Sequence, residues 1–204
     1  FSGWDFTGQD VDKTHYNQFN QNIGKWNVGN VTYMYDMFYK SNFNNGGSSD
    51  ISGWDTQKVE FIGGMFQYTE FNQPINTRTD GNKWNVSNVT AFDYMFANNT
   101  EFNQDISDWS LNTVDPSGIT MSHIFAYASN FNQDIGNWDV SGVTDMSKMF
   151  YNCSQFNQDI GNWNVSKVTN MSEMFYDASG FDQPNIRKWD VSHMLDSSFN
   201  QMFH

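Results

Sequence analysis

The sequence predicts an α/β repeat solenoid, a leucine-rich-repeat-like stack with one short parallel strand and one short helix in each coil of about 25 residues. Three observations predict this fold. Two segments, Phe131–Phe150 and Phe156–Phe175, read FNQDIGNWDVSGVTDMSKMF and FNQDIGNWNVSKVTNMSEMF and lie 25 residues apart. The eight tryptophans fall one in each unit. Met-Phe or Ile-Phe pairs close the units, at positions 37–38, 65–66, 95–96, 124–125, 149–150, 174–175 and 202–203.

Each unit combines two hydrophobic periods. The alternation of Trp138 and Val140 is typical of a short strand. Met146, Met149, Phe150 and Cys153 then follow at the i, i+3, i+4, i+7 spacing of one helical face. We therefore expect a strand followed by one or two helical turns in every coil. A single coil cannot bury its apolar face, so neighbouring coils must stack to form a shared core with a parallel sheet on one side.

The chain is expected to be one domain, residues 1–204, with about eight tandem repeats. The coils are marked by Trp4, Trp26, Trp54, Trp84, Trp109, Trp138, Trp163 and Trp189. Insertions concentrate at three predicted loops, Asn44–Asp50, Thr77–Asn82 and Asn112–Ser117. Polar caps, which soluble repeat arrays need, are not evident at either end. We therefore expect a fragment of a longer protein, or neighbours that stack on the open coils.

Aromatic residues replace leucine in the predicted core. The chain has 19 Phe, 9 Tyr, 8 Trp and 11 Met, and its leucines are Leu111 and Leu195. Tryptophan recurs beside Val and Ile in every unit, which favours a core position over an exposed sugar-stacking face. The methionine spacing likewise predicts core packing. The single cysteine, Cys153, cannot form an internal disulfide and is expected to be a small buried hydrophobe.

The composition excludes two classes of partner. The formal net charge is -13, from 23 acidic and 10 basic side chains. Nucleic acid is not an expected partner, because phosphate neutralisation needs a basic surface. No apolar run approaches the roughly 20 residues of a spanning helix, so we expect no direct membrane insertion.

The repeat resembles a known family. The pattern F-N-Q-D-I-x-x-W-D-V-S-x-V-T-x-M-x-x-M-F is similar to the surface repeats of BspA-like leucine-rich-repeat proteins and mycoplasma-type lipoproteins, and the resemblance is strongest from Phe102 to Trp189. The resemblance implies an extracellular or cell-surface protein associated with adhesion. Two segments depart from the pattern, Trp54–Glu60 (WDTQKVE) and Trp109–Thr113 (WSLNT). A binding patch in these remodelled coils is one interpretation of the departure.

The recurrent Asn-Gln-Asp runs, such as Asn132-Gln133-Asp134, admit two interpretations. Calcium is the one cofactor that these oxygen-rich side chains suggest. The favoured interpretation is structural: the amides stack from coil to coil and satisfy buried backbone groups of the turns. We therefore predict no cofactor and no metal ligands.

Two sets of residues are candidate sites. Tyrosines outside the repeat pattern are candidate ligand contacts on the surface: Tyr16, Tyr33, Tyr35, Tyr68 and Tyr94. Seven asparagines begin N-x-S/T and are candidate glycosylation acceptors, although the repeat itself generates this pattern: Asn30, Asn85, Asn88, Asn98, Asn152, Asn164 and Asn170.

No catalytic residues are predicted. The four histidines occupy unrelated positions in the repeat, and no HExxH, GxSxG or phosphate-loop motif occurs. The sequence favours a non-catalytic extracellular repeat domain that recognises proteins or glycans on a host, a matrix or a neighbouring cell. The alternative is a structural stalk, fibre or coat module that associates with itself end to end.

Overall fold

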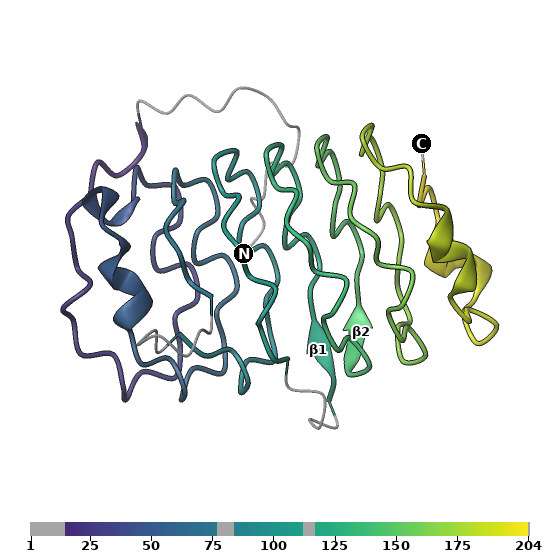
Figure 1. Ribbon diagram of the computed structural model, residues 1–204, viewed down its shortest axis with the longest axis horizontal. Coiled ribbons are helices and arrows are strands. Elements are labelled where there is room, and N and C mark those ends of the chain that lie inside the picture. Colours follow the sequence, from purple (N-terminus) through teal and green to yellow (C-terminus); the bar gives the residue numbers. More distant parts are fainter. Residues whose placement is uncertain (1–14, 77–83, 112–116, 204) are drawn as a thin grey trace.

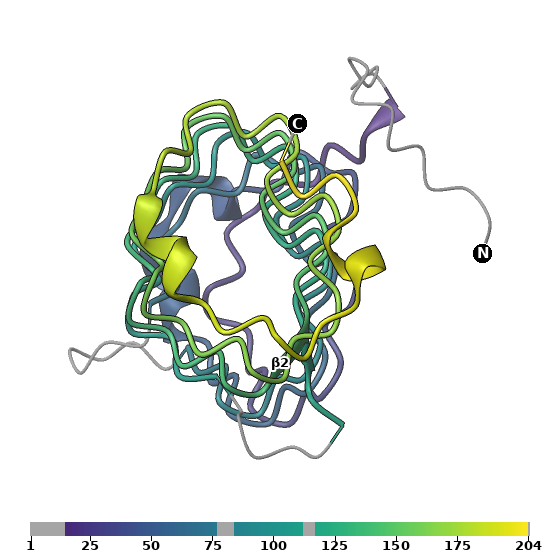
Figure 2. The same ribbon diagram turned by 90° about the vertical axis from the view of Figure 1, so that its right-hand side faces the viewer.

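The computed structural model describes residues 15–76, 84–111 and 117–203. These residues wind into coils that stack along one axis (Figure 1). Viewed along the stack, successive coils follow nearly the same outline (Figure 2). Parallel pairing links them: every bridge and the one short sheet join equivalent segments of neighbouring coils that run in the same direction.

A ribbon of tight turns takes the place of the expected helix. In one coil, the peptide N–H groups of Met146, Lys148 and Phe150 donate to carbonyls of the next coil, each at 2.9 Å. The N–H groups between them close turns within the coil, Met149 to Met146 and Cys153 to Phe150. One set of N–H groups therefore stabilises the turns within the coil, and the alternate set holds the coil against the next one. The same alternation recurs in the other coils of the described chain.

The helix predicted over Met146–Cys153 is wrong, and the described residues contain no α-helix. Lys148 (φ 53°) and Asn152 (φ 54°) adopt the left-handed conformation, which ends a right-handed helix after each turn. Two consecutive turns bring Met146, Met149, Phe150 and Cys153 to the inside of the coil. They thereby reproduce the spacing of one helical face without forming a helix.

The regular elements are short. Strand β1 spans Ile119–Thr120 and pairs in parallel with β2, Val143–Asp145, with a shift in register between the two pairs. The strand expected at Trp138 and Val140 is wrong, because the Trp138 N–H closes a turn onto the Ile135 carbonyl. Four 3₁₀ helices lie wholly within the described residues: η2 (Asn45–Gly47), η3 (Ser49–Gly53), η4 (Pro184–Lys188) and η5 (Asp196–Phe199).

Two columns of phenylalanine form the centre of the core. Within each coil, one ring of each column stacks face to face on the other, with centroids 3.7 to 4.1 Å apart. Between coils the rings repeat at about 6 Å, for example 5.7 Å from Phe96 to Phe125 and 6.1 Å from Phe102 to Phe131. Large flat rings stacked in this way fill the interior of the coil without leucine.

A tryptophan column flanks the phenylalanines and also links the coils. The indole Nε1 of Trp138 donates to the Ile106 carbonyl of the preceding coil at 3.0 Å, and Trp163 donates to Ile135 in the same way. The core position predicted for tryptophan is confirmed for the buried members Trp54, Trp84, Trp109, Trp138, Trp163 and Trp189. It is wrong for Trp26, which is 53% exposed in the first described coil. Trp4 lies outside the described residues.

An asparagine–glutamine ladder runs along the stack. The Asn132 side-chain Oδ1 accepts hydrogen bonds from the Asn157 N–H and from the Gln158 amide, both at 2.9 Å. The Asn132 N–H in turn donates to Asn103 Oδ1 of the preceding coil. The structural interpretation of the Asn-Gln runs is thus confirmed: these amides satisfy backbone groups between coils.

Candidate functional site

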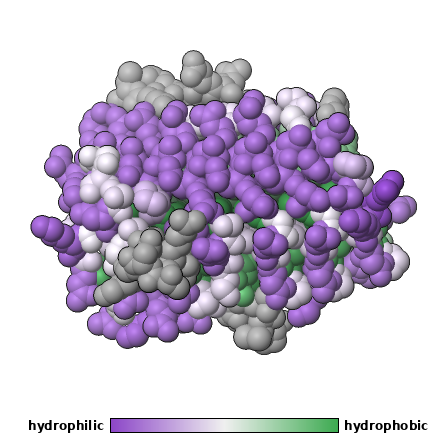
Figure 3. Space-filling model, viewed as in Figure 1, coloured by the Kyte–Doolittle hydropathy of each residue, from purple (hydrophilic) through white to green (hydrophobic). Residues whose placement is uncertain are grey.

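The turn ribbon presents outward-facing side chains in columns. One column, which we call the bridge column, is linked by parallel bridges from coil to coil and consists of Tyr33, Phe61, Ala91, Thr120, Asp145 and Asn170. A second, which we call the left-handed column, holds the positive-φ residue that lies three positions after each member of the bridge column: Asp36, Gly64, Tyr94, His123, Lys148 and Glu173. The surface in Figure 3 is mostly hydrophilic, with hydrophobic side chains visible in narrow bands between polar rows. The columns therefore form a surface of varied chemistry over an apolar core.

A polar cluster occupies the centre of this face. The Asp93 carboxylate accepts hydrogen bonds from the Thr120 hydroxyl at 2.5 Å and from the Ser122 N–H at 2.9 Å. Burial raises the pKa of Asp93, and these two hydrogen bonds oppose that rise. The carboxylate is thus held in place by the next coil, in a setting that disfavours its charge.

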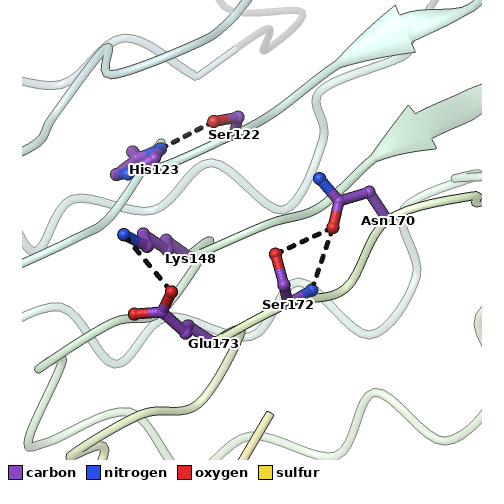
Figure 4. A network of polar contacts seen from close by, with 6 residues as sticks. All are labelled: Ser122, His123, Lys148, Asn170, Ser172 and Glu173. Carbon is purple, nitrogen blue, oxygen red and sulfur yellow. Dashed lines mark hydrogen bonds and ion pairs between the residues drawn. The ribbon is translucent and has the colours of Figure 1, made fainter. Parts of the chain in front are cut away.

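His123 sits beside this cluster. Its ring stacks on Tyr94 with centroids 4.3 Å apart, and Nδ1 lies 2.6 Å from the Ser122 hydroxyl (Figure 4). Burial, and secondarily the positive charge of Lys148, lowers the pKa of His123 to about 3. The imidazole is therefore neutral at physiological pH and contributes a flat, weakly polar surface.

The next two coils carry charge. Lys148 Nζ lies 3.5 Å from Glu173 Oε1, and Asn170 Oδ1 accepts from the Ser172 N–H and hydroxyl (Figure 4). Lys148 and Glu173 are partly exposed, so this ion pair contributes little to folding stability. Both side chains project from strained left-handed positions towards a surface where a partner can contact them.

Aromatic residues occupy the other end of the face. Tyr33 stacks on Phe61 with centroids 4.8 Å apart and ring planes 5° apart. Tyr33 is 66% exposed and Tyr35 is 49% exposed. The face therefore changes along the stack, from aromatic through polar to charged.

The surface of the described residues includes a larger and a smaller groove. The larger, about 560 Å³, is lined by Thr32, Lys58, Glu60, Phe61, Asn88, Thr90 and Ser117 and adjoins the bridge column. The smaller, about 440 Å³, runs beside the asparagine–glutamine ladder and is lined by Asn72, Glu101, Asn103, Asn130, Asn132 and Gln155. Lys58, Glu60 and Phe61 come from the remodelled coil that begins at Trp54, where the sequence departs from the repeat.

Buried polar atoms mark one further place on the face. Asp36 Oδ1 and both amide atoms of Gln67 are buried and form no hydrogen bond within the described part of the chain. Burial raises the pKa of Asp36. A β-carbon at Gly64 would lie 2.0 Å from Asp36 Oδ1, so the glycine provides the space that this carboxylate occupies. Ordered water is the usual partner for such atoms.

The candidate tyrosines divide into exposed and buried residues. Tyr33 and Tyr35 are exposed, and Tyr94 is half-buried against His123. The surface exposure expected for Tyr16 and Tyr68 is wrong, because both are buried. The two rings meet edge to face at 6.4 Å, and Lys40 lies over the Tyr68 ring at 5.3 Å from its centroid. These two tyrosines pack against each other instead of facing a ligand.

The candidate glycosylation acceptors differ in accessibility. Exposed residues are Asn30, Asn88 and Asn164, and half-buried residues are Asn85, Asn98, Asn152 and Asn170. The Asn98 side-chain nitrogen is itself buried, so the folded chain has no room for a sugar on it. Asn88 Nδ2 donates to the Gln57 carbonyl at 2.6 Å, and a glycan on this nitrogen would leave a single N–H for that bond.

The predicted loop Asn44–Asp50 is folded and forms η2 and the start of η3. Asn45 is buried there, and its Oδ1 accepts from the Ile23 N–H at 2.8 Å. Its Nδ2 donates to the Ser48 carbonyl and to Asp50. The insertion is thus an ordered part of its coil. Residues 77–82 of the second predicted loop, and 112–116 of the third, lie outside the described residues.

The described ranges hold neither a cluster of metal-ligating side chains nor a membrane-spanning helix. No group of three or more His, Cys, Asp or Glu side chains is placed to hold a metal ion there. None of the helices in those ranges is long and apolar enough to cross a bilayer.

Candidate residues that the sequence-based prediction did not single out are Asp93, His123 and Phe61, whereas the groove residues Lys58 and Glu60 lie in the segment Trp54–Glu60 that it had marked. The signal for the groove was present, because Trp54–Glu60 loses the V-S-x-V-T core. Asp93 and His123 gave no such signal, because both contact residues of a neighbouring coil, and the spacing within one coil does not indicate which residues those are.

Comparison with known proteins identifies the family. The family model described as Mycoplasma protein of unknown function, DUF285, matches residues 9–82, 49–119 and 117–204. No curated protein and no solved structure matches the chain significantly. Since the three matches together span residues 9–204, the chain belongs to the DUF285 family of Mycoplasma proteins.

Proposed function

We propose that this chain is a non-catalytic recognition domain of a cell-surface protein, and that it binds protein or glycan partners through the bridge column and the left-handed column. The observation that carries the proposal is a contrast between inside and outside. Each phenylalanine column keeps the same residue in six consecutive coils, from Phe38 to Phe175 and from Phe43 to Phe181. The bridge column over the same coils holds Tyr, Phe, Ala, Thr, Asp and Asn.

The left-handed column strengthens this proposal. A left-handed residue other than glycine costs about 1–2 kcal/mol, and glycine or asparagine is the inexpensive choice. The chain places Tyr94, Lys148 and Glu173 at these positions instead, and other coils hold the better tolerated Asp36 and His123. Side chains kept at such a cost are expected to serve something other than stability.

The resemblance to BspA-like surface repeats supports the location on the cell surface. The bridge-column face also suits a broad contact, since affinity can be spread over several coils of a rigid array. The aromatic end near Tyr33 and the charged end near Lys148 provide different chemistry at the two ends of one surface.

The test is binding of the wild-type chain to immobilised host-matrix proteins and to a glycan array, with Tyr33→Ala in the bridge column and Lys148→Ala in the left-handed column as face variants. Asn162→Ala, at an exposed residue outside both columns, is the matched control. We expect specific binding that the face variants weaken and the control leaves unchanged. Absence of binding to every surface would overturn the proposal.

A second candidate is a structural spacer. It is favoured by the asparagine–glutamine ladder, which runs from Asn20 to Asp182 and ties the described coils into a rigid rod. A spacer would tolerate both face variants without effect and would show its function in assembly, measured by light scattering against concentration.

A further inference from the structure

We propose that the groove beside Phe61 binds one pyranose ring of a neutral oligosaccharide. This inference rests on the proposed recognition function and names the ligand class of one part of the binding face. Its starting point is a gap in the bridge column: Tyr33 stacks on one face of Phe61 at 4.8 Å, but the bridged residue on the other side is Ala91.

Ala91 ends at its β-carbon, so the second face of Phe61 has no ring stacked on it among the described residues. The next member of the column is Thr120, bridged to Ala91. If the coil spacing matches the 4.8 Å between Tyr33 and Phe61, two steps place Thr120 about twice that distance from the Phe61 ring. A ring stacked at van der Waals distance needs about 4 Å of this space. The gap over Ala91 therefore has the width of one saccharide ring.

The groove next to this gap supplies polar groups. Its volume of about 560 Å³ is within the usual range for small-molecule sites. Glu60 and the hydroxyl-bearing Thr32 and Thr90 line it together with the Phe61 ring. Asn88 uses its side-chain N–H on the Gln57 carbonyl, which leaves its amide oxygen as an acceptor. An aromatic face beside a carboxylate, an amide and hydroxyls matches the two sides of a sugar, one of C–H groups and one of hydroxyls.

The backbone in the groove argues against an extended peptide as ligand. Peptides that add to a sheet edge need unpaired backbone groups. Here the Glu60 N–H donates to the Thr32 carbonyl at 2.9 Å, and the Thr90 N–H donates to the Glu60 carbonyl at 3.0 Å. The Thr120 N–H donates to Thr90 in turn. Recognition must therefore come from side chains.

Charge selects neutral sugars. Lys58, the cation of the groove, donates to Asn30 Oδ1 at 2.7 Å, and Glu60 adds a negative charge close by. The whole chain has a formal net charge of -13. Sialylated or sulfated glycans would be repelled by this field, whereas neutral hydroxyls can donate to Glu60 and Asn88.

The test is titration of the wild-type chain with maltotriose, chitotriose and lactose, followed by saturation-transfer NMR. Ala91→Tyr continues the ring column and fills the gap. Phe61→Leu removes the aromatic platform. Ser179→Tyr introduces the same ring at an exposed site outside the groove. We expect at least one of the three sugars to bind, a loss of about tenfold or more in affinity for both groove variants, and wild-type affinity for Ser179→Tyr, with circular dichroism confirming each fold.

Three results would overturn the groove proposal while leaving the recognition function intact: cell or matrix binding without binding of any of these sugars, unchanged sugar affinity in Ala91→Tyr or Phe61→Leu, or preference for sialyllactose over lactose. Loss of binding after protease treatment of the target, but not after its glycosidase treatment, would assign the face to a protein partner. That result would also overturn the groove proposal and leave the recognition function intact. A wild-type chain that binds no surface and no glycan would overturn the recognition function itself.

Discussion

The indole N–H of Trp138 donates to the carbonyl of Ile106, 32 residues earlier, at 3.0 Å. Both residues are buried. The indole N–H groups of Trp54, Trp109, Trp163 and Trp189 bond the preceding coil in the same way, so these core residues also set the stacking of the coils.

Substitution Trp138→Phe keeps a ring and removes this hydrogen bond. We expect the free energy of unfolding to fall by about 1–3 kcal/mol, because the Ile106 carbonyl keeps only the Trp109 N–H, at 3.2 Å, as a partner and the smaller ring leaves space in the core. Urea denaturation followed by circular dichroism measures the change. Trp26→Phe is the control, since Trp26 is half exposed; an equal loss there would show that the indole hydrogen bond is not the cause.

The asparagine–glutamine ladder predicts a difference between two substitutions of Asn132. Asn132→Ala removes the acceptor of the Asn157 N–H and the Gln158 amide and should cost about 1–3 kcal/mol. Asn132→Asp keeps the acceptor oxygen and should stay within about 0.5 kcal/mol of wild type at neutral pH. Thermal denaturation compares the two. Equal losses would mean that the amide group itself, and not its oxygen, matters.

Gly64 is expected to tolerate no side chain. Its φ is 62°, and a β-carbon would meet Asp36 Oδ1. Gly64→Ala should therefore lower stability by about 1–3 kcal/mol. At Gly53, a β-carbon would have no atom within 4 Å, and Gly53→Ala should be nearly neutral. Chemical denaturation of both variants checks the contrast, which a loss in Gly53→Ala of the same size would contradict.

The pKa of His123 predicts how stability depends on pH. The folded chain holds this pKa at about 3, well below the ordinary value of 6.5. Between these values the His123 imidazole is protonated in the unfolded chain and neutral in the folded chain. The free energy of unfolding therefore falls as pH decreases from about 6.5 towards 3. The slope contributed by His123 is at most about 1.4 kcal/mol per pH unit. Above pH 7 the contribution to stability is fully present.

The measurement is the pH dependence of urea unfolding for wild type and His123→Asn, since asparagine accepts the left-handed conformation. The variant should lose stability less steeply between pH 6.5 and about 4. Asp93 titrates nearby with a raised pKa and remains in both proteins, so the difference between the two slopes isolates the histidine. Parallel slopes would contradict the prediction.

The repeat and its core could be predicted because a coil must place the same side chains inward each time. The buried Trp, Phe and Met positions follow directly from this constraint. The helix at Met146–Cys153 could not be excluded, because two consecutive turns and one helical face put the same residues inside. The helix and the pair of turns differ in the acceptor of the Lys148 N–H. Here that acceptor is the Ser172 carbonyl, which belongs to another coil.

The candidate site was harder to predict than the core. The departure at Trp54–Glu60 marked the coil that carries the groove, but the gap over Ala91 depends on its bridged neighbours Phe61 and Thr120. Tyr16 and Tyr68 lie outside the repeat pattern and yet are buried, because they meet each other across coils. Pairings between coils of unequal length cannot be read from the spacing within one coil.

The direction of the backbone ladder has a consequence for how such chains change over generations. In the turn ribbon each coil donates N–H groups to the coil that follows, as Phe125 donates to Met149, and next to the bridge column it donates to the coil before, as Thr120 donates to Thr90. Any coil therefore offers its neighbours the same two edges. A duplicated or deleted stretch of about 25 residues leaves matching edges on both sides of the junction, so a gene of this kind can lengthen or shorten by whole units while the varied outer positions are reshuffled into new surfaces.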